Sequence, residues 1–253
     1  MTDLPYADNV VKKIDLDHDG HPEILLGGGC IPLAYPLAHP TCLYRYAGGR
    51  LVRAAETALD SLGVIRDLTI TGIDHDGGED VLAVGAWSGI LLLENKLGSL
   101  QPARNIYPGR TGLWNRIQIT DIDNDGDQDL IVINDHIAGL GGGNALWRND
   151  GPGDAPGAWR FTSVGAAAGV AIPANSGGEG VNGMGLAVGD VDHDGFPDLA
   201  FSNIGPNYLL LNNGDGSFRD VSAEMGMRRG LLACVLVVCA QDSDDEYSVG
   251  VFF

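Results

Sequence analysis

Four acidic segments repeat along the chain, and their side chains have a spacing that suits one chemistry. The segments occupy residues 15–23, 72–80, 121–129 and 190–198. Their shared template is D-x-D-x-D-G-x-x-[DE], which places acids at positions 1, 3, 5 and 9 and glycine at position 6. Alternating carboxylates converge when the chain curls tightly, and glycine permits the curl because it has no Cβ. Since clustered carboxylates repel one another, the template predicts that each segment binds a cation.

Calcium is the cation that this set of oxygen donors predicts. Ca²⁺ takes about six to eight oxygen ligands, whereas Mg²⁺ requires a smaller octahedron and keeps several of its waters. We expect the acids of each segment to be the ligands, together with the backbone carbonyl of position 7. The predicted metal ligands are Asp15, Asp17, Asp19, Glu23, Asp74, Asp76, Asp80, Asp121, Asp123, Asp125, Asp129, Asp190, Asp192, Asp194 and Asp198.

An EF-hand is the main alternative calcium motif, and the residues after each segment exclude it. An EF-hand needs a glutamate at position 12 and flanking helices. Position 12 is instead apolar, as Leu26, Ala83, Val132 and Phe201. The second segment also departs from the template, because Gly72 stands where the other three have aspartate. We therefore predict four strand–loop–strand calcium loops, of which the second contributes least.

The segments around each loop predict the elements that position it. A short apolar stretch precedes each loop, another follows it, and a third ends in a cluster of Asn, Asp and Gly that is typical of a hairpin turn. The loops begin 57, 49 and 69 residues apart, and no long helical pattern intervenes. Four short antiparallel strands at such a period form a β-propeller blade. Residues 1–230 are therefore predicted to be all-β, with about four four-stranded blades.

The remaining residues, 231–253, do not continue the repeat. An apolar run at 231–240 is followed by an acidic stretch at 242–246. The apolar run is ten residues long, which is far short of the roughly 20 residues that a membrane-spanning helix needs. The N-terminus has neither the basic nor the apolar region of a signal peptide. We expect an atypical tail and no membrane insertion.

Charge and cysteine content narrow the possible functions further. The 253 residues include 34 acidic and 15 basic side chains, for a formal charge of −19. This charge repels phosphate backbones, so we predict no nucleic-acid partner. The four cysteines form no CxxC pair and complete no zinc site. Cys30 and Cys42 are either free thiols or a bridge between neighbouring strands.

No catalytic arrangement is apparent in the sequence. The acid pairs with suitable spacing all belong to the loops, and no serine lies in a nucleophile-elbow context. His18, His75 and His193 each occupy position 4 of a loop, where we expect a solvated turn residue. Two kinds of function stay open: a calcium-stabilised binding or adhesion module, and a carbohydrate-binding module.

The segments that follow the last two loops resemble a known repeat family. They read LWRNDGPG…WRFTSVGAAAGV and NYLLLNNGDGSFRDVSAEMGM. With the acidic loops, they resemble FG-GAP/VCBS-type repeats over residues 8–230, and above all the ASPIC/UnbV and cartilage-acidic-protein-like subset. The resemblance implies a calcium-binding β-propeller, as in the head of integrin α chains, with the acids above as metal ligands. It also implies an extracellular or periplasmic location.

The chain departs from this family in its number of repeats. Family propellers often have seven blades, whereas four repeats are present here and the ASPIC/UnbV C-terminal module is absent. We expect an incomplete, open portion of a larger propeller, as in a fragment or a truncated gene product. The predicted function is a non-catalytic, calcium-binding module for protein or matrix interaction and adhesion, with an unidentified protein or glycan partner. The alternative is a lectin-like propeller or an accessory domain of a polysaccharide-active enzyme.

Overall fold

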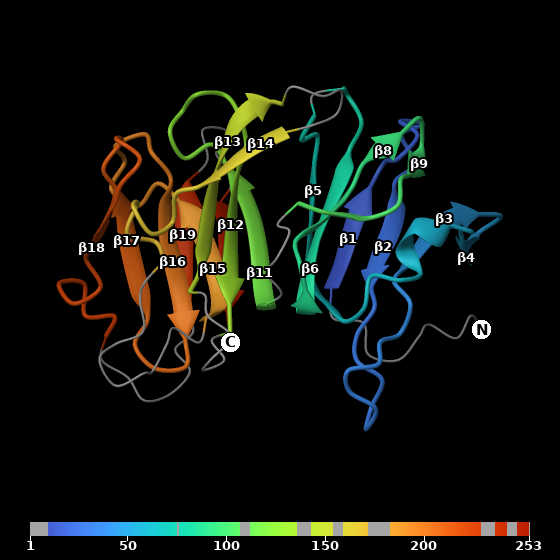
Figure 1. The fold of residues 1–253 in the computed structure, drawn as a ribbon, viewed down its shortest axis with the longest axis horizontal. Coiled ribbons are helices and arrows are strands. Elements are labelled where there is room, and N and C mark those ends of the chain that lie inside the picture. The colour runs from blue at the N-terminus through green and yellow to red at the C-terminus, as the bar shows by residue number, and fades with distance from the viewer. Residues whose placement is uncertain are drawn as a thin grey trace. The chain divides into compact units, whose positions relative to one another are not determined.

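Strands make up nearly all the regular structure of the chain in a computed structural model (Figure 1). The structure describes residues 10–74, 76–106, 112–135, 143–153, 159–171, 183–228, 236–241 and 247–252. Within these ranges the only helical element is a 3-10 turn, η1 (Thr57–Leu59). No helix in this part of the chain is long and apolar enough to cross a membrane.

The first of two units, Met1–Ile117, contains one separate four-stranded antiparallel sheet and a second set of four strands that belongs to an eight-stranded sheet, in which β6 (Asp80–Ser88) also pairs with β11 (Gly112–Thr120). Each set of four strands follows chain order, as the repeat predicts. The first blade consists of β1 (Val10–Ile14), β2 (Glu23–Gly27), β3 (Cys42–Ala47) and β4 (Arg50–Arg53). The second consists of β5 (Ile65–Thr71), β6 (Asp80–Ser88), β7 (Leu91–Leu93) and β10 (Arg104–Asn105). A small hairpin, β8 (Asn95–Lys96) with β9 (Ser99–Leu100), extends from the second blade.

The second unit, Gln118–Phe253, repeats this arrangement. The third blade has the order β11 (Gly112–Thr120), β12 (Asp129–Asn134), β13 (Ala145–Pro152) and β14 (Trp159–Ser163), and β11 begins before the unit boundary. The fourth consists of β15 (Gly183–Gly189), β16 (Asp198–Asn203), β17 (Tyr208–Asn212) and β18 (Phe218–Asp220). In the tail, β19 (Leu236–Gln241) pairs with β20 (Tyr247–Phe252) as a separate two-stranded sheet.

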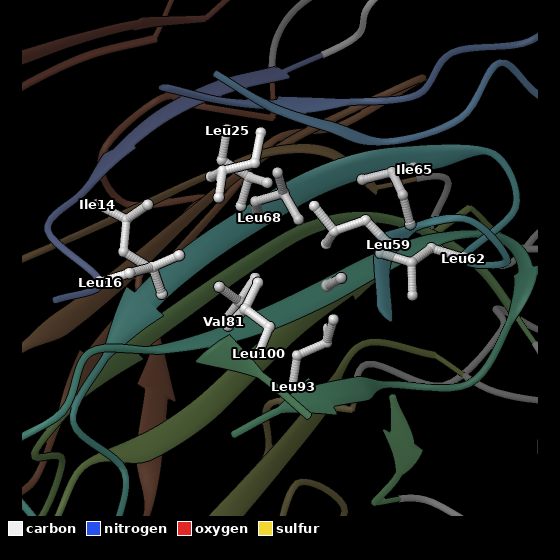
Figure 2. Close-up of a cluster of buried hydrophobic side chains, with 12 residues drawn as sticks. Ile14, Leu16, Leu25, Leu59, Leu62, Ile65, Leu68, Val81, Leu93 and Leu100 are labelled. Atoms are coloured by element: carbon white, nitrogen blue, oxygen red, sulfur yellow. The ribbon is translucent and has the colours of Figure 1, made fainter. Parts of the chain in front are cut away.

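Blades pack on one another through their apolar faces. In the first unit, Leu25 of β2 lies in one buried cluster with Leu68 of β5 and Val81 of β6 (Figure 2). Leu16, at position 2 of the first acidic loop, belongs to the same cluster and is 1% exposed. A single sheet cannot bury both of its faces, so stacking of neighbouring blades supplies the core. Position 2 therefore anchors the first loop, and likewise Ile122 of the third, in a buried cluster, whereas Val191 of the fourth loop is 38% exposed.

The predicted all-β architecture of four-stranded propeller blades is confirmed. Each second strand begins at position 9 of its loop, at Glu23, Asp80, Asp129 and Asp198. The loop is thus the connection between the first two strands of every blade. Of the two alternatives for Cys30 and Cys42, the structure shows thiols rather than a bridge between them, and Cys42 is buried.

Candidate metal centre

The glycine at position 6 creates the tight curl of every acidic loop. Its φ angle is +79° at Gly20, +91° at Gly77, +96° at Gly126 and +92° at Gly195. Side chains other than glycine are strained at such angles. In three loops the glycine N–H donates a hydrogen bond to the position-1 aspartate, for example from Gly126 to Asp121 at 2.8 Å. Gly72 has no side chain to accept this bond in the second loop.

Position 5 is oriented in the same way in all four loops. Its carboxylate accepts a hydrogen bond from the backbone N–H of position 7, as in Asp125 with Asp127 (2.9 Å) and Asp194 with Phe196 (2.9 Å). This Asx turn leaves the second carboxylate oxygen available for another partner. The turn therefore orients a potential ligand before any cation arrives.

Carboxylate oxygens gather in three of the loops. One oxygen from each of three acids lies within 4.8 Å of the other two in each group. The groups are Asp15, Asp17 and Asp19; Asp121, Asp123 and Asp129; and Asp190, Asp192 and Asp194. In the described part of the chain, the second loop forms no such group.

Two oxygens in these groups are buried without a hydrogen-bond partner. They are Oδ1 of Asp15 and Oδ1 of Asp123. An unpaired buried oxygen of an ionised group is costly unless a cation or donor satisfies it. Burial raises the pKa of Asp123, and the nearby carboxylates of Asp125 and Asp121 raise it further. A hard divalent cation fits this donor set, because it would satisfy the unpartnered oxygens and relieve the repulsion.

The acid at position 9 has a structural role that the sequence pattern does not reveal. Asp129 is fully buried, and its two oxygens accept the backbone N–H groups of Ile122 (2.8 Å) and Asn149 (2.7 Å). Asp80 and Asp198 make the equivalent pairs of bonds in their own blades. Each carboxylate thereby ties the loop to the third strand or the hairpin that continues it. Burial raises the pKa of Asp80 to about 6 and that of Asp129 to about 7.

The first loop differs at this position because its acid is glutamate. Glu23 accepts the N–H of Leu16 at 3.1 Å, while its other oxygen pairs with Arg45 Nε at 3.0 Å. Arg45 also lies 3.8 Å from Asp17. The Arg45 side chain therefore replaces the backbone N–H that binds the position-9 acid in the other loops, and its positive charge offsets the negative charge of Glu23.

A lysine occupies the centre of the second loop. Lys96 Nζ lies 2.5 Å from Asp74 Oδ2 and 2.7 Å from Asp76 Oδ2. The predicted ligands Asp74 and Asp76 are thus brought together, but around an ammonium group. Asp80, at the start of β6, is fully buried.

A recurrent asparagine near the end of the third strand is a second feature that sequence reasoning missed. Asn95, Asn149 and Asn212 each accept an N–H from a glycine of the following turn. Asn95 and Asn212 also donate to a backbone carbonyl of the preceding blade's loop, at Leu16 and Ile122. The turn cluster of Asn, Asp and Gly was the available signal, but it indicated only a hairpin.

Comparisons with known proteins agree with this architecture. An FG-GAP-like repeat profile matches residues 72–132, and an FG-GAP repeat profile matches residues 182–209. Cartilage acidic protein 1 from Homo sapiens and from Mus musculus are each 28% identical over 89% of this chain. The chain spans only 35% and 36% of the length of these two relatives.

A solved structure shows the same fold. It is that of an Agrocybe aegerita lectin that recognises non-reducing terminal N-acetylglucosamine, with a TM-score of 0.54 and 17% identity. The alignment covers 96% of this chain and 60% of the lectin chain. The two profiles place FG-GAP repeats at the second, third and fourth acidic loops, and the chain is similar to the cartilage acidic proteins over most of its length.

Proposed function

We propose that the first, third and fourth loops each bind one Ca²⁺ and that the blades so stabilised form a non-catalytic interaction module. The observation that carries this proposal is the gathering of three carboxylates in each of these loops. The unpartnered buried oxygens of Asp15 and Asp123 support it independently. Bound Ca²⁺ supplies positive charge between the carboxylates, while the chain's own turns orient the ligands.

Calcium is expected to affect stability, because the loops join strands whose side chains form the core. A ligand that binds only the folded state stabilises by about 2.7 kcal/mol per site at 100 times Kd. For a chain of this size that corresponds to roughly 5–10 °C in Tm per site. Thermal melts in CaCl₂ and in EDTA test the proposal, with MgCl₂ as the ion control. Identical melts in all three would contradict it.

The partner that we propose is a protein or matrix component outside the cell. The chain remains strongly acidic even with three Ca²⁺ bound, so its surface favours a basic ligand. The cartilage proteins to which it is similar support a matrix setting. Calcium sites of extracellular modules have Kd values of about 10⁻⁴–10⁻³ M, which suits loops as exposed as these. Pull-down from matrix extract, with calcium and with EDTA, tests whether binding needs the metal-loaded blades.

Carbohydrate binding is a second candidate, favoured by one exposed aromatic pair. Trp87, at the end of β6, is 42% exposed, and its indole N–H donates to the hydroxyl of Tyr35, which is 52% exposed. Trp87 also has a φ of +60°, which is uncommon for an aromatic residue. Exposed aromatic rings are suitable stacking surfaces for sugars. The lectin that shares the fold makes N-acetylglucosamine the first sugar to test.

A glycan array separates the two candidates. Carbohydrate binding predicts a signal that Trp87→Ala abolishes and that Tyr46→Ala preserves. Tyr46 is a suitable control because it is an exposed aromatic residue on a different strand, β3. An array without signal for the calcium-loaded protein would eliminate the second candidate and leave the first unaffected.

A further inference from the structure

The second blade differs from the other three in two charged positions: it lacks one acid of the loop and has a lysine where the others have no base. At position 1 of the loop, Asp15, Asp121 and Asp190 correspond to Gly72. Relative to the strand register, Lys96 corresponds to Ala47, Asp150 and Asn213 in the other blades. The blade that has lost an acid is therefore the one that has gained a base at this position.

The gained base contacts two of the three acids that remain in the second loop. Lys96 Nζ bridges Asp74 Oδ2 and Asp76 Oδ2 at 2.5 and 2.7 Å, although the three residues lie on two separate segments. The Asp74 side chain is only 7% exposed, so its charge is poorly solvated by water. Positions 3 and 5 are the acids that gather with position 1 in the first and fourth loops. The ammonium therefore neutralises carboxylates that the template assigns to a cation.

The backbone around Lys96 holds it in this place. Asn95, its neighbour on β8, donates its own N–H to Asp80 Oδ1 and its side-chain amide to the carbonyl of Leu16, both at 2.8 Å. The tight turn after Lys96 has positive φ angles of +56° at Leu97 and +84° at Gly98. The backbone of Lys96 is thus held in a hairpin, so less conformational entropy is lost when its side chain pairs with Asp74 and Asp76.

We propose that Lys96 is the cation of the second loop, and that this loop holds no Ca²⁺. The ammonium supplies the positive charge that Ca²⁺ supplies in the other loops, so the second blade is stable without metal. The inference rests on the proposed function for the other three loops. It assigns a stoichiometry of three ions per chain, where the template alone assigns four.

The arginine of the first loop does not act in the same way. Arg45 pairs with Glu23 at position 9 and lies farther from Asp17. Asp15, Asp17 and Asp19 still form an oxygen group, and Asp15 Oδ1 has no partner. The Arg45 guanidinium therefore pairs mainly with the position-9 acid of the first loop, whereas the Lys96 ammonium lies between the acids at positions 3 and 5 of the second.

Counting bound Ca²⁺ by native mass spectrometry tests the proposal. We expect three ions on the wild-type chain and four on the double variant Gly72→Asp/Lys96→Ala. Gly72 tolerates a side chain with a small local shift, because a Cβ there would lie 3.2 Å from the Gly78 carbonyl and its φ is not in the left-handed region. Four ions on the wild type, or three on a folded double variant, would overturn the proposal while leaving the proposed function intact. No ions on either would instead defeat the proposed function.

Thermal melts of single variants provide a second measurement, whose decisive comparison is made in EDTA. Lys96→Ala should lower Tm equally in CaCl₂ and in EDTA, because the bridge it removes is independent of calcium. Lys96→Arg should restore part of the loss, and Lys13→Ala, an exposed lysine of β1, should have little effect. A Tm of Lys96→Ala that matches wild type in EDTA would show that Lys96 is not the stabilising cation.

Discussion

The side-chain amide of Asn212 donates a hydrogen bond of 2.8 Å to the backbone carbonyl of Ile122, 90 residues earlier in the chain. Asn212 ends β17 of the fourth blade, whereas Ile122 is position 2 of the third blade's acidic loop. The two loops touch again where the Asn124 side chain donates to the Gly195 carbonyl at 3.2 Å. The acidic loop of the third blade is therefore hydrogen-bonded both to the third strand and to the acidic loop of the fourth blade.

Asn212→Ala should weaken calcium binding at the third loop, although Asn212 is not a predicted ligand. The substitution leaves the buried Ile122 carbonyl without its donor, at a cost of about 1–3 kcal/mol. Calorimetric titration with Ca²⁺ should show a reduced affinity and an unchanged number of sites. Asn213→Ala, at the exposed neighbouring position, is the matched control. Unchanged affinities in both variants would show that the loops act independently.

Asp123→Ala should remove one bound Ca²⁺ and destabilise the chain only when calcium is present. Asp123 belongs to the gathered oxygens of the third loop and has an unpartnered buried oxygen. In EDTA its removal relieves repulsion from Asp121 and Asp125, so we expect a Tm equal to or above that of wild type. Asp192→Ala should behave in the same way at the fourth loop. A loss of Tm in EDTA as large as in calcium would contradict a metal-binding role.

Asp129→Ala is expected to differ from Asp123→Ala, because Asp129 also binds the backbone. Its removal leaves the buried N–H groups of Ile122 and Asn149 without an acceptor. We expect a loss of about 1–3 kcal/mol in EDTA as well as in calcium. Urea unfolding under both conditions measures this difference. Equal stability of the variant and wild type in EDTA would show that position 9 serves only the metal.

The blades and the loops were predictable because their signals are local. A glycine at position 6, apolar runs on both sides and a turn cluster lie within a few dozen residues of one another. The curl at Gly126 and the start of β12 at Asp129 follow from that pattern. Such features depend on backbone geometry and strand periodicity, which the residues of a short segment express on their own.

The contacts that connect loops to other segments were not predictable in the same way. Lys96 reaches Asp74 across 22 residues, and the bond depends on a turn in which Leu97 adopts a positive φ. Asn95 reaches Leu16 across 79 residues. Gly72 alone indicated that the second loop would bind calcium least well. The contact of Lys96 with Asp74 and Asp76 could not be predicted, because it depends on how the β8–β9 hairpin folds against the loop.

The calcium-free protein should become less stable as the pH rises from about 4 to about 7. Burial raises the pKa of Asp80 to about 6 and that of Asp129 to about 7, against about 3.9 in an unfolded chain. Between these values the folded state binds more protons than the unfolded state, so the free energy of unfolding decreases with increasing pH. Repulsion among the many other acids acts in the same direction.

Melts in EDTA between about pH 5 and pH 7.5 test this prediction, because folded Asp129 loses its proton within that interval, whereas the unfolded residue is already ionised. Asp129→Ala should flatten the slope, whereas Lys13→Ala should not. Saturating Ca²⁺ should also flatten it, because a bound cation keeps Asp129 ionised across the interval. Proton competition further predicts that the affinity for Ca²⁺ falls as the pH is lowered from 7.5 to 5. An EDTA-treated protein whose Tm rises with pH over this interval would show that the buried carboxylates are ionised and satisfied without metal.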